Sequence, residues 1–120
     1  MTDLRIAIIG DKSFNDYPGM KSLLDTFVSI HDEKTISIIS SDSKGASSLA
    51  KKYALDSNIE FKCYPADKES FGAIAGLIRD KEMVGESDRV IAFYNGKPGE
   101  TKNALEEADR AEIPHYVVAG

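Results

Sequence analysis

The sequence is poor in several residue types that mark particular classes of protein. It has one cysteine, Cys63, no tryptophan and two histidines in 120 residues. A single cysteine excludes an intramolecular disulfide and a multi-thiolate metal site, and it points to a reducing compartment. No apolar run approaches the roughly 18 residues that span a bilayer, and the N-terminus leads directly into a strand-like segment without a signal peptide. These absences predict a cytoplasmic protein with no membrane partner.

Catalytic and cofactor-binding motifs are also missing. The chain contains no G-x-G-x-x-G, G-x-x-x-x-G-K-[ST], H-E-x-x-H or G-x-S-x-G pattern. His31 and His115 have no nucleophile or metal ligand at motif spacing; His31 is expected to end a helix, and Cys63 to be a buried, inert thiol. The sequence therefore supports neither a metal site nor a triad hydrolase, identifies no catalytic residue and implies no cofactor.

What the chain does contain is typical of one soluble domain spanning residues 1–120. Hydrophobic residues make up 42% and charged residues 29%, and a domain of this length buries enough surface to form a core. Fifteen basic and twenty acidic residues give a net charge of −5. An acidic balance argues against a dedicated nucleic-acid surface, although a local basic cluster still suits phosphate.

Two periodicities alternate along the chain. Short apolar runs rich in β-branched residues predict strands at residues 4–9, 35–40, 59–64, 89–94 and 114–118. Amphipathic stretches between them predict helices at residues 17–30, 46–55, 70–84 and 101–111. This order is typical of right-handed βαβ crossovers. It predicts a three-layer, Rossmann-like α/β fold with a five-stranded, mainly parallel sheet whose strands are mostly buried on both faces.

Ligands of such sheets bind beyond the carboxyl ends of the strands. The loops expected there are residues 10–14, 40–45, 64–68 and 95–101, and three of the four combine glycine with hydroxyl groups or lysine, which suits an anion. Each loop also has a structural interpretation. Asn15 or Asp16 would cap the first helix, Ser43 the second and Thr101 the last.

The predicted helix at residues 70–84 carries a further candidate. Gly72 and Gly76 lie four residues apart on one helix face, and Arg79 follows near that face. An arginine there would make bidentate contacts to a phosphate. The alternative is a surface salt bridge with Asp80 or Glu82.

Four segments, taken in order, resemble the motifs of one family. Residues 10–17 (GDKSFNDY) resemble G-x-R-x-F-x-D-Y, and residues 44–54 (KGASSLAKKYA) resemble G-A-x-G-A-D-x-L-A-x-x-Y-A. Residues 64–83 resemble F-P-A-D-W-x-x-x-G-x-x-A-G-x-x-R-N-x-x-M, and residues 91–97 resemble I-A-F-W-D-G-K. The chain thus resembles the YspA-like branch of the SLOG superfamily, Rossmann-like domains related to the Lonely Guy phosphoribohydrolases and to the DNA-processing protein DprA.

The resemblance implies binding or sensing of a nucleotide or nucleotide-derived small molecule at the second and fourth loops, in a chain that pairs into a homo-oligomer. The sequence departs from the family where Asp42 and Glu100 replace glycines, and it lacks the hydrolases' glutamate after Thr101. Carboxylates oppose a phosphate, so we expect a non-catalytic binding protein. The alternatives are a nucleoside-monophosphate phosphoribohydrolase that uses Asp42, Asp67 or Glu100, and an interaction protein with a degenerate pocket.

The predicted ligand site combines cations that neutralise phosphate with glycines and hydroxyl groups that orient it. Its members are Gly10, Lys12, Ser13, Ser41, Lys44, Gly45, Arg79, Gly96, Lys97 and Thr101.

Overall fold

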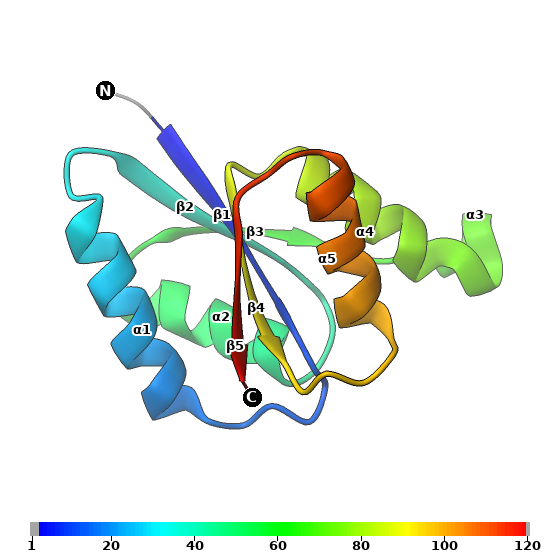
Figure 1. Ribbon diagram of the computed structural model, residues 1–120, viewed down its shortest axis with the longest axis horizontal. Helices are drawn as coiled ribbons and strands as arrows, with labels where there is room; N and C mark the ends of the chain where they lie inside the picture. Colours follow the sequence, from blue (N-terminus) through cyan, green and yellow to red (C-terminus); the bar gives the residue numbers. More distant parts are fainter. Residues whose placement is uncertain (1–2, 120) are drawn as a thin grey trace.

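The computed structural model describes residues 3–119 and contains one sheet of five parallel strands (Figure 1). The strands are β1 (Asp3–Gly10), β2 (Thr35–Ser41), β3 (Glu60–Tyr64), β4 (Arg89–Tyr94) and β5 (His115–Ala119). The helices are α1 (Tyr17–Ile30), α2 (Ala46–Asp56), α3 (Lys68–Phe71), the 3₁₀ turn η1 (Gly72–Ile74), α4 (Ala75–Gly85) and α5 (Glu100–Arg110). The predicted α/β class is confirmed, and the sheet is wholly parallel.

Two helical layers cover the two faces of the sheet, with α1 and α2 on one side and α4 and α5 on the other (Figure 1). Strand β1 contributes side chains to both layers, because successive side chains of a strand point to opposite faces of the sheet. Ile6 and Ile8 pack with α1 and α2, whereas Ala7 and Ile9 pack with α4 and α5. This alternation explains why the central strand reads as a continuous apolar run.

The strand order β3-β2-β1-β4-β5 places a topological switch point between β1 and β4. The chain first builds outward from β1 to β3, then crosses back to β4 and continues to β5. The loops that follow β1 and β4 therefore lead to helices on opposite faces, which leaves a crevice at their carboxyl ends. The register pairs Gly10 with Phe93 at this point.

The predicted helix at residues 70–84 is wrong in its first half, because the segment breaks at Gly72. This glycine ends α3 with a φ of 58°, in the left-handed region that favours glycine. Helix α3 begins after Asp67, whose carboxylate accepts a hydrogen bond from the Ser70 N–H. Gly72 and Gly76 therefore do not share a helix face.

The outer strands are less buried than the apolar runs predict. Strand β3 has no fully buried residue, and β5 has none either. Both lie at the edges of the sheet, so part of each strand is exposed to solvent. The prediction of a buried Cys63 is wrong, since the thiol is exposed on β3. Within residues 3–119 no helix combines the length and apolar character that crossing a bilayer requires.

Candidate functional site

Four loops meet at the carboxyl edge of the sheet. The first loop is residues 11–16 after β1, the second is residues 42–45 after β2, the third is residues 65–67 after β3, and the fourth is residues 95–99 after β4. Because the sheet is parallel, all four lie at the same edge, as the sequence predicts. A ligand can bind at this edge only in the space that the loop side chains leave unfilled.

Asp11 ties the first loop to the fourth across the switch point. Its carboxylate accepts a hydrogen bond from the Asn95 N–H at 2.7 Å and another from the Thr101 hydroxyl at 2.9 Å. Its own N–H donates to the Phe93 carbonyl at 3.0 Å. Thr101 is therefore not the cap of α5, whose N-cap is Gly99. A protein carboxylate thus holds the hydroxyl that the sequence assigns to a ligand.

The second loop packs directly against the first. Gly45, the N-cap of α2, has a φ of 74°, and a Cβ added to it would lie 2.3 Å from the Asp11 carbonyl oxygen. The Ala46 N–H donates to that same carbonyl at 3.2 Å. Glycine is required here for close packing of backbone on backbone. The expected Ser43 cap is absent, because no side chain caps α2.

Two further predicted residues are engaged within the protein. A Cβ at Gly10 would lie 2.4 Å from the Ala46 Cβ, so the space beside this glycine is filled by α2. The Ser41 hydroxyl lies 2.8 Å from that of Ser47 and accepts a hydrogen bond from the Ser43 N–H. Gly10 and Ser41 therefore take part in packing and hydrogen bonding within the protein.

Arg79 lies at the centre of a cluster of four charges, which we call the Arg79 cluster. Its side chain is 4% exposed, and its Nε donates to the Asp80 carboxylate at 2.7 Å. The two terminal nitrogens reach Asp42 and Glu100, each at 3.3 Å. The surface salt bridge considered for Arg79 is therefore a buried one, with three carboxylates around one guanidinium.

Burial acts on this cluster as well as charge. It raises the pKa of the Asp80 carboxyl above its usual range, although the neighbouring Arg79 charge acts in the opposite direction. Asp80 is 5% exposed at its side chain, whereas Asp42 and Glu100 are about half exposed, at 52% and 48%. The Arg79–Asp80 pair is the buried anchor, and the other two carboxylates lie on its solvent side.

The Arg79 cluster fills the space between the second and fourth loops. The hollow that remains there, lined by Ser41, Ser43 and Thr101 among others, has a volume of about 20 Å³. Such a volume accepts about one water molecule. The space directly between the second and fourth loops is therefore mostly occupied by side chains of the protein.

A larger cavity of about 820 Å³, the outer cavity, lies on the other side of this cluster. Its charged rim comprises Lys12, Lys44 and Lys68, which we call the lysine rim, together with Arg79, Asp42 and Glu100. Its remaining surface comes from small and apolar residues: Ser43, Ala66, Gly72, Ala73, Ala75, Gly76 and Leu77.

The lysine rim differs from Arg79 in having no anionic partner. Lys12, Lys44 and Lys68 are exposed, and among residues 3–119 none of their ammonium groups forms an ion pair or a hydrogen bond. They come from the first loop, the second loop and the start of α3. Three uncompensated cations from separate segments thus face one cavity.

A shallower depression of about 380 Å³ lies between the first and fourth loops and shares Lys12 and Glu100 with the outer cavity. Five of the predicted residues line it: Gly10, Lys12, Ser13, Lys97 and Thr101. Gly96 has a φ of 87° and lines neither hollow. Nine of the ten predicted residues are thus divided between two neighbouring hollows and the packed loop interior, and Gly96 is exposed outside both hollows.

Sequence reasoning missed two residues at this edge. Lys68 lies directly after Asp67 at the carboxyl end of β3, and its place in a loop at that edge is the signal that would have identified it. Asp11 was visible within the first loop, but nothing in the spacing shows that its carboxylate reaches Thr101, ninety positions later.

The three carboxylates considered for glycosidic-bond cleavage are all engaged. Asp42 and Glu100 pair with Arg79, and Asp67 caps α3. Within the described residues no group of three or more histidine, cysteine, aspartate or glutamate side chains is arranged to hold a metal ion.

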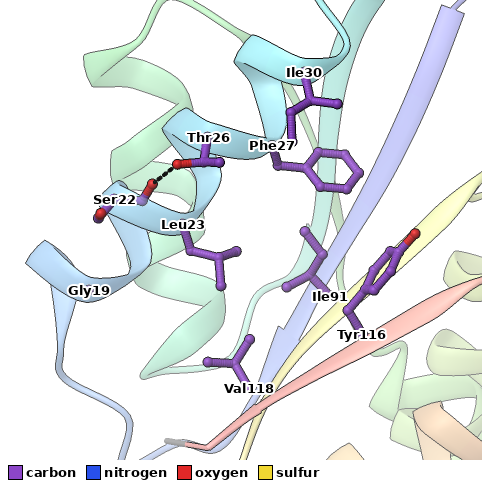
Figure 2. A pocket seen from close by; sticks show the side chains of 9 residues that line it. All are labelled: Gly19, Ser22, Leu23, Thr26, Phe27, Ile30, Ile91, Tyr116 and Val118. Carbon is purple, nitrogen blue, oxygen red and sulfur yellow. Dashed lines mark hydrogen bonds between the residues drawn. The ribbon is translucent and has the colours of Figure 1, made fainter.

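A different groove, of about 520 Å³, runs between α1 and the α1-facing side of β4 and β5 (Figure 2). Figure 2 shows Leu23, Phe27 and Ile30 of α1 across from Tyr116 and Val118 of β5. Among the described residues 3–119 no charged side chain lines the groove, and none of the ten predicted ligand residues belongs to it. An apolar lining of this kind does not suit a phosphate.

Comparison with solved structures identifies the fold. DNA processing protein A (DprA) from Streptococcus pneumoniae superposes with a TM-score of 0.77 at 14% identity, covering 98% of this chain and 51% of that one. DprA from Helicobacter pylori superposes with a TM-score of 0.76 at 16% identity, covering 99% of this chain and 66% of that one. The chain thus has a Rossmann-like fold similar to that of DprA. The chain spans about half the length of the pneumococcal protein.

No protein-family model matches the chain, and no curated protein matches it. The assignment to the YspA-like branch therefore stays a prediction from the motifs.

Proposed function

We propose that this chain binds a small anionic ligand derived from a nucleotide in the outer cavity, and does so without catalysis. The observation that carries the proposal is the lysine rim. Lys12, Lys44 and Lys68 converge on one cavity without a carboxylate partner among the described residues, in a chain whose net charge is −5. Cations that repel one another at a common site are stabilised when an anion binds between them.

The rest of the lining suits the neutral part of such a ligand. Ala73, Ala75 and Leu77 offer apolar surface beside the charged rim. Gly72 and Gly76 also line the cavity and add no side chain to its wall. Binding pockets for nucleotides commonly combine apolar walls with a few polar groups that fix orientation. The cavity volume of about 820 Å³ lies within the range of small-molecule sites.

The likeness to DprA supports the nucleotide class. The Helicobacter pylori structure was described for its single-stranded DNA binding mode, and this chain has the same fold over 99% of its length. The acidic balance of this chain favours a mononucleotide or a related small molecule over a polymer with many phosphates.

The proposal of a non-catalytic protein rests on the engaged carboxylates. Cleavage of an N-glycosidic bond needs a carboxylate beside the ribose to stabilise the developing positive charge. In the ligand-free protein Asp42 and Glu100 pair with Arg79 and Asp67 caps a helix, and the chain lacks the glutamate that the hydrolases carry after the position of Thr101. We expect no release of free base when nucleoside monophosphates are incubated with the protein and analysed by chromatography.

Calorimetric titration with AMP, NAD and ADP-ribose tests the binding proposal. The variant Lys12→Gln/Lys44→Gln/Lys68→Gln is expected to weaken binding of a responding ligand at least tenfold. The matched control, Lys34→Gln/Lys51→Gln/Lys81→Gln, removes the same charge outside the cavity and is expected to bind as wild type does. Equal losses in both variants, or no response to any ligand at millimolar concentration, would contradict the proposal.

A second candidate, an interaction protein that has lost its nucleotide pocket, is favoured by the filled space between the second and fourth loops. The Arg79 cluster leaves only about 20 Å³ there. This candidate predicts flat titrations with every nucleotide, in wild type and in the lysine variants alike.

A further inference from the structure

We propose that Asp42 and Glu100 form a reversible latch on Arg79, and that a bound phosphate group takes their place on the guanidinium. This inference rests on the proposed function, because the latch opens into the same outer cavity. On this proposal Arg79 binds the ligand, but in the free protein its terminal nitrogens are occupied by carboxylates. Asp42 and Glu100 then determine specificity, because an anion must displace them to bind.

The three ion pairs of Arg79 are unequal, and this inequality indicates which of them exchange. Nε is held by Asp80 at 2.7 Å, with both side chains buried. The contacts to Asp42 and Glu100 are longer, at 3.3 Å each, and these two carboxylates are about half exposed. Exposed ion pairs contribute little to stability, whereas a short buried pair resists separation. The outer two pairs are the ones that a competing anion can replace.

The buried pair also keeps Arg79 in position after the exchange. Asp80 fixes the Nε edge of the guanidinium, so the two terminal nitrogens stay directed toward the outer cavity, which Arg79 lines. A planar guanidinium donates two parallel hydrogen bonds to a phosphate. One dianionic phosphate would replace two monoanionic carboxylates, so the charge around Arg79 would be unchanged.

The displaced carboxylates can rotate into the solvent. Asp42 lies in the second loop and Glu100 in the first turn of α5, and each already has half of its side chain in water. Rotation of either side chain away from Arg79 would complete its hydration without moving a buried group. The exchange therefore requires side-chain rotation and leaves the helices in place.

Gly76 keeps the space beside the latch open. A Cβ at this position would lie 3.2 Å from Glu100 Oε1 and 3.6 Å from the nearer Arg79 terminal nitrogen, Nη2. The first distance is shorter than ordinary van der Waals contact, so any larger residue would press on the carboxylate. Glycine at position 76 therefore leaves room for the Glu100 carboxylate beside Arg79.

The experiment measures binding of inorganic phosphate at pH 8, where it is mainly a dianion, to four proteins of confirmed fold. Asp42→Asn/Glu100→Gln removes both latch charges and keeps the side-chain shapes. We expect phosphate to bind this variant about tenfold more tightly than wild type, because the two longer, partly buried ion pairs no longer compete for Arg79. The matched control Asp32→Asn/Glu106→Gln removes two exposed charges that make no ion pair with Arg79, and it should bind as wild type does.

The fourth protein adds Arg79→Lys to the Asp42→Asn/Glu100→Gln background. Lysine keeps a positive charge beside Asp80 but cannot donate two parallel hydrogen bonds to a phosphate, so the gain in affinity should disappear. In wild type, the side-chain NMR signals of the Arg79 guanidinium should shift on addition of phosphate, and the ¹³C carboxylate signals of Asp42 and Glu100 should move toward those of hydrated carboxylates. If the double variant is poorly folded, Glu100→Gln alone tests the same direction with a smaller gain.

The outcomes separate the latch from the proposed function. Unchanged or weaker phosphate binding in Asp42→Asn/Glu100→Gln, with binding that still depends on the lysine rim, overturns the latch and leaves the proposed function standing. A gain that Arg79→Lys does not remove also overturns the latch. Phosphate binding to neither wild type nor the double variant overturns the latch, and the proposed function falls with it only when AMP, NAD and ADP-ribose also fail to bind.

Discussion

At Gly10, strand β1 packs tightly against strand β4 and helix α2. A Cβ there would lie 2.4 Å from the Ala46 Cβ and 2.8 Å from the Phe93 carbonyl oxygen, and neither neighbour is a flexible side-chain end. We expect Gly10→Ala to lower the free energy of unfolding by about 2–3 kcal/mol, as overpacking does in tight cores. Urea denaturation monitored by circular dichroism measures the change.

Gly85→Ala is the matched control for Gly10→Ala. Gly85 ends α4, has no atom within 4 Å of an added Cβ and does not have the left-handed backbone of Gly45. Alanine should leave stability unchanged or raise it by about 0.5 kcal/mol, because it restricts the unfolded chain. Equal destabilisation of the two variants would show that Gly10 is not a packing constraint.

Tyr53 gives a pH-dependent prediction at the same scale. Burial and its hydrogen bond to Asp25, at 2.8 Å, raise the pKa of Tyr53 to about 12. Between pH 10 and 12 the unfolded tyrosine ionises while the folded one stays protonated, so the contribution of Tyr53 to stability is complete below pH 10 and falls as pH rises. This loss amounts to about 2 kcal/mol.

Tyr53→Phe should isolate that contribution. The difference in unfolding free energy between wild type and Tyr53→Phe is expected to stay constant from pH 6 to 9 and to shrink above pH 10, because phenylalanine has no group to ionise. Urea denaturation at intervals of half a pH unit measures it. Parallel stability curves up to pH 11.5 would contradict the assignment.

At the scale of elements, the segment after β3 contains two parts of unequal stability. Helix α3 and the turn η1 have no buried residue, whereas α4 buries Ala75, Met83 and Val84 together with the Arg79–Asp80 pair. Figure 1 shows α3 at the periphery, away from the sheet. Few buried contacts allow local opening at low free energy, so we expect amides of residues 68–74 to exchange much faster than those of residues 78–85.

Hydrogen exchange followed by mass spectrometry measures this difference, and it also reports on the outer cavity. A saturating ligand that binds Lys68 should slow exchange at residues 66–77 and leave α1 unchanged, which serves as the internal control. Equal protection of α3 and α4 in the free protein would contradict the two-part description.

The same segment shows why the elements could be predicted well and the site only in part. Periodicity and turn residues locate the helices at residues 17–30 and 46–55 to within one residue, because one face of each packs on the sheet. They do not show that Gly72 takes a positive φ, since a glycine is also tolerated inside a helix. Long-range contacts such as Asp11 with Thr101, or Arg79 with Asp42, depend on the strand order. That Lys12, Lys44 and Arg79 lie near one another at this edge could be predicted, because they lie at strand ends or on the following helix; their binding of a ligand stays a prediction.

At the scale of the whole molecule, a net charge of −5 coexists with three uncompensated lysines at one cavity. The long-range field therefore repels a polyanion, while the short-range field at the lysine rim attracts a single phosphate group. The DprA structures share the fold at 14% and 16% identity, so the charge argument rests on the residues of this chain alone.

This balance predicts that a polymer gains nothing over a monomer. A (dT)₁₀ oligonucleotide should bind no more tightly than a mononucleotide at 150 mM salt, because three lysines of the described residues line the cavity and the chain as a whole carries a net charge of −5. Fluorescence anisotropy of a labelled oligonucleotide, competed with the unlabelled mononucleotide, measures both affinities. Loss of the three rim lysines should abolish whatever binding there is.

An oligonucleotide that binds at least tenfold more tightly, with a slope of log K against log salt steeper than about −2, would require more phosphate contacts than the lysine rim provides. The site would then extend beyond the outer cavity, as expected of a single-stranded DNA-binding protein.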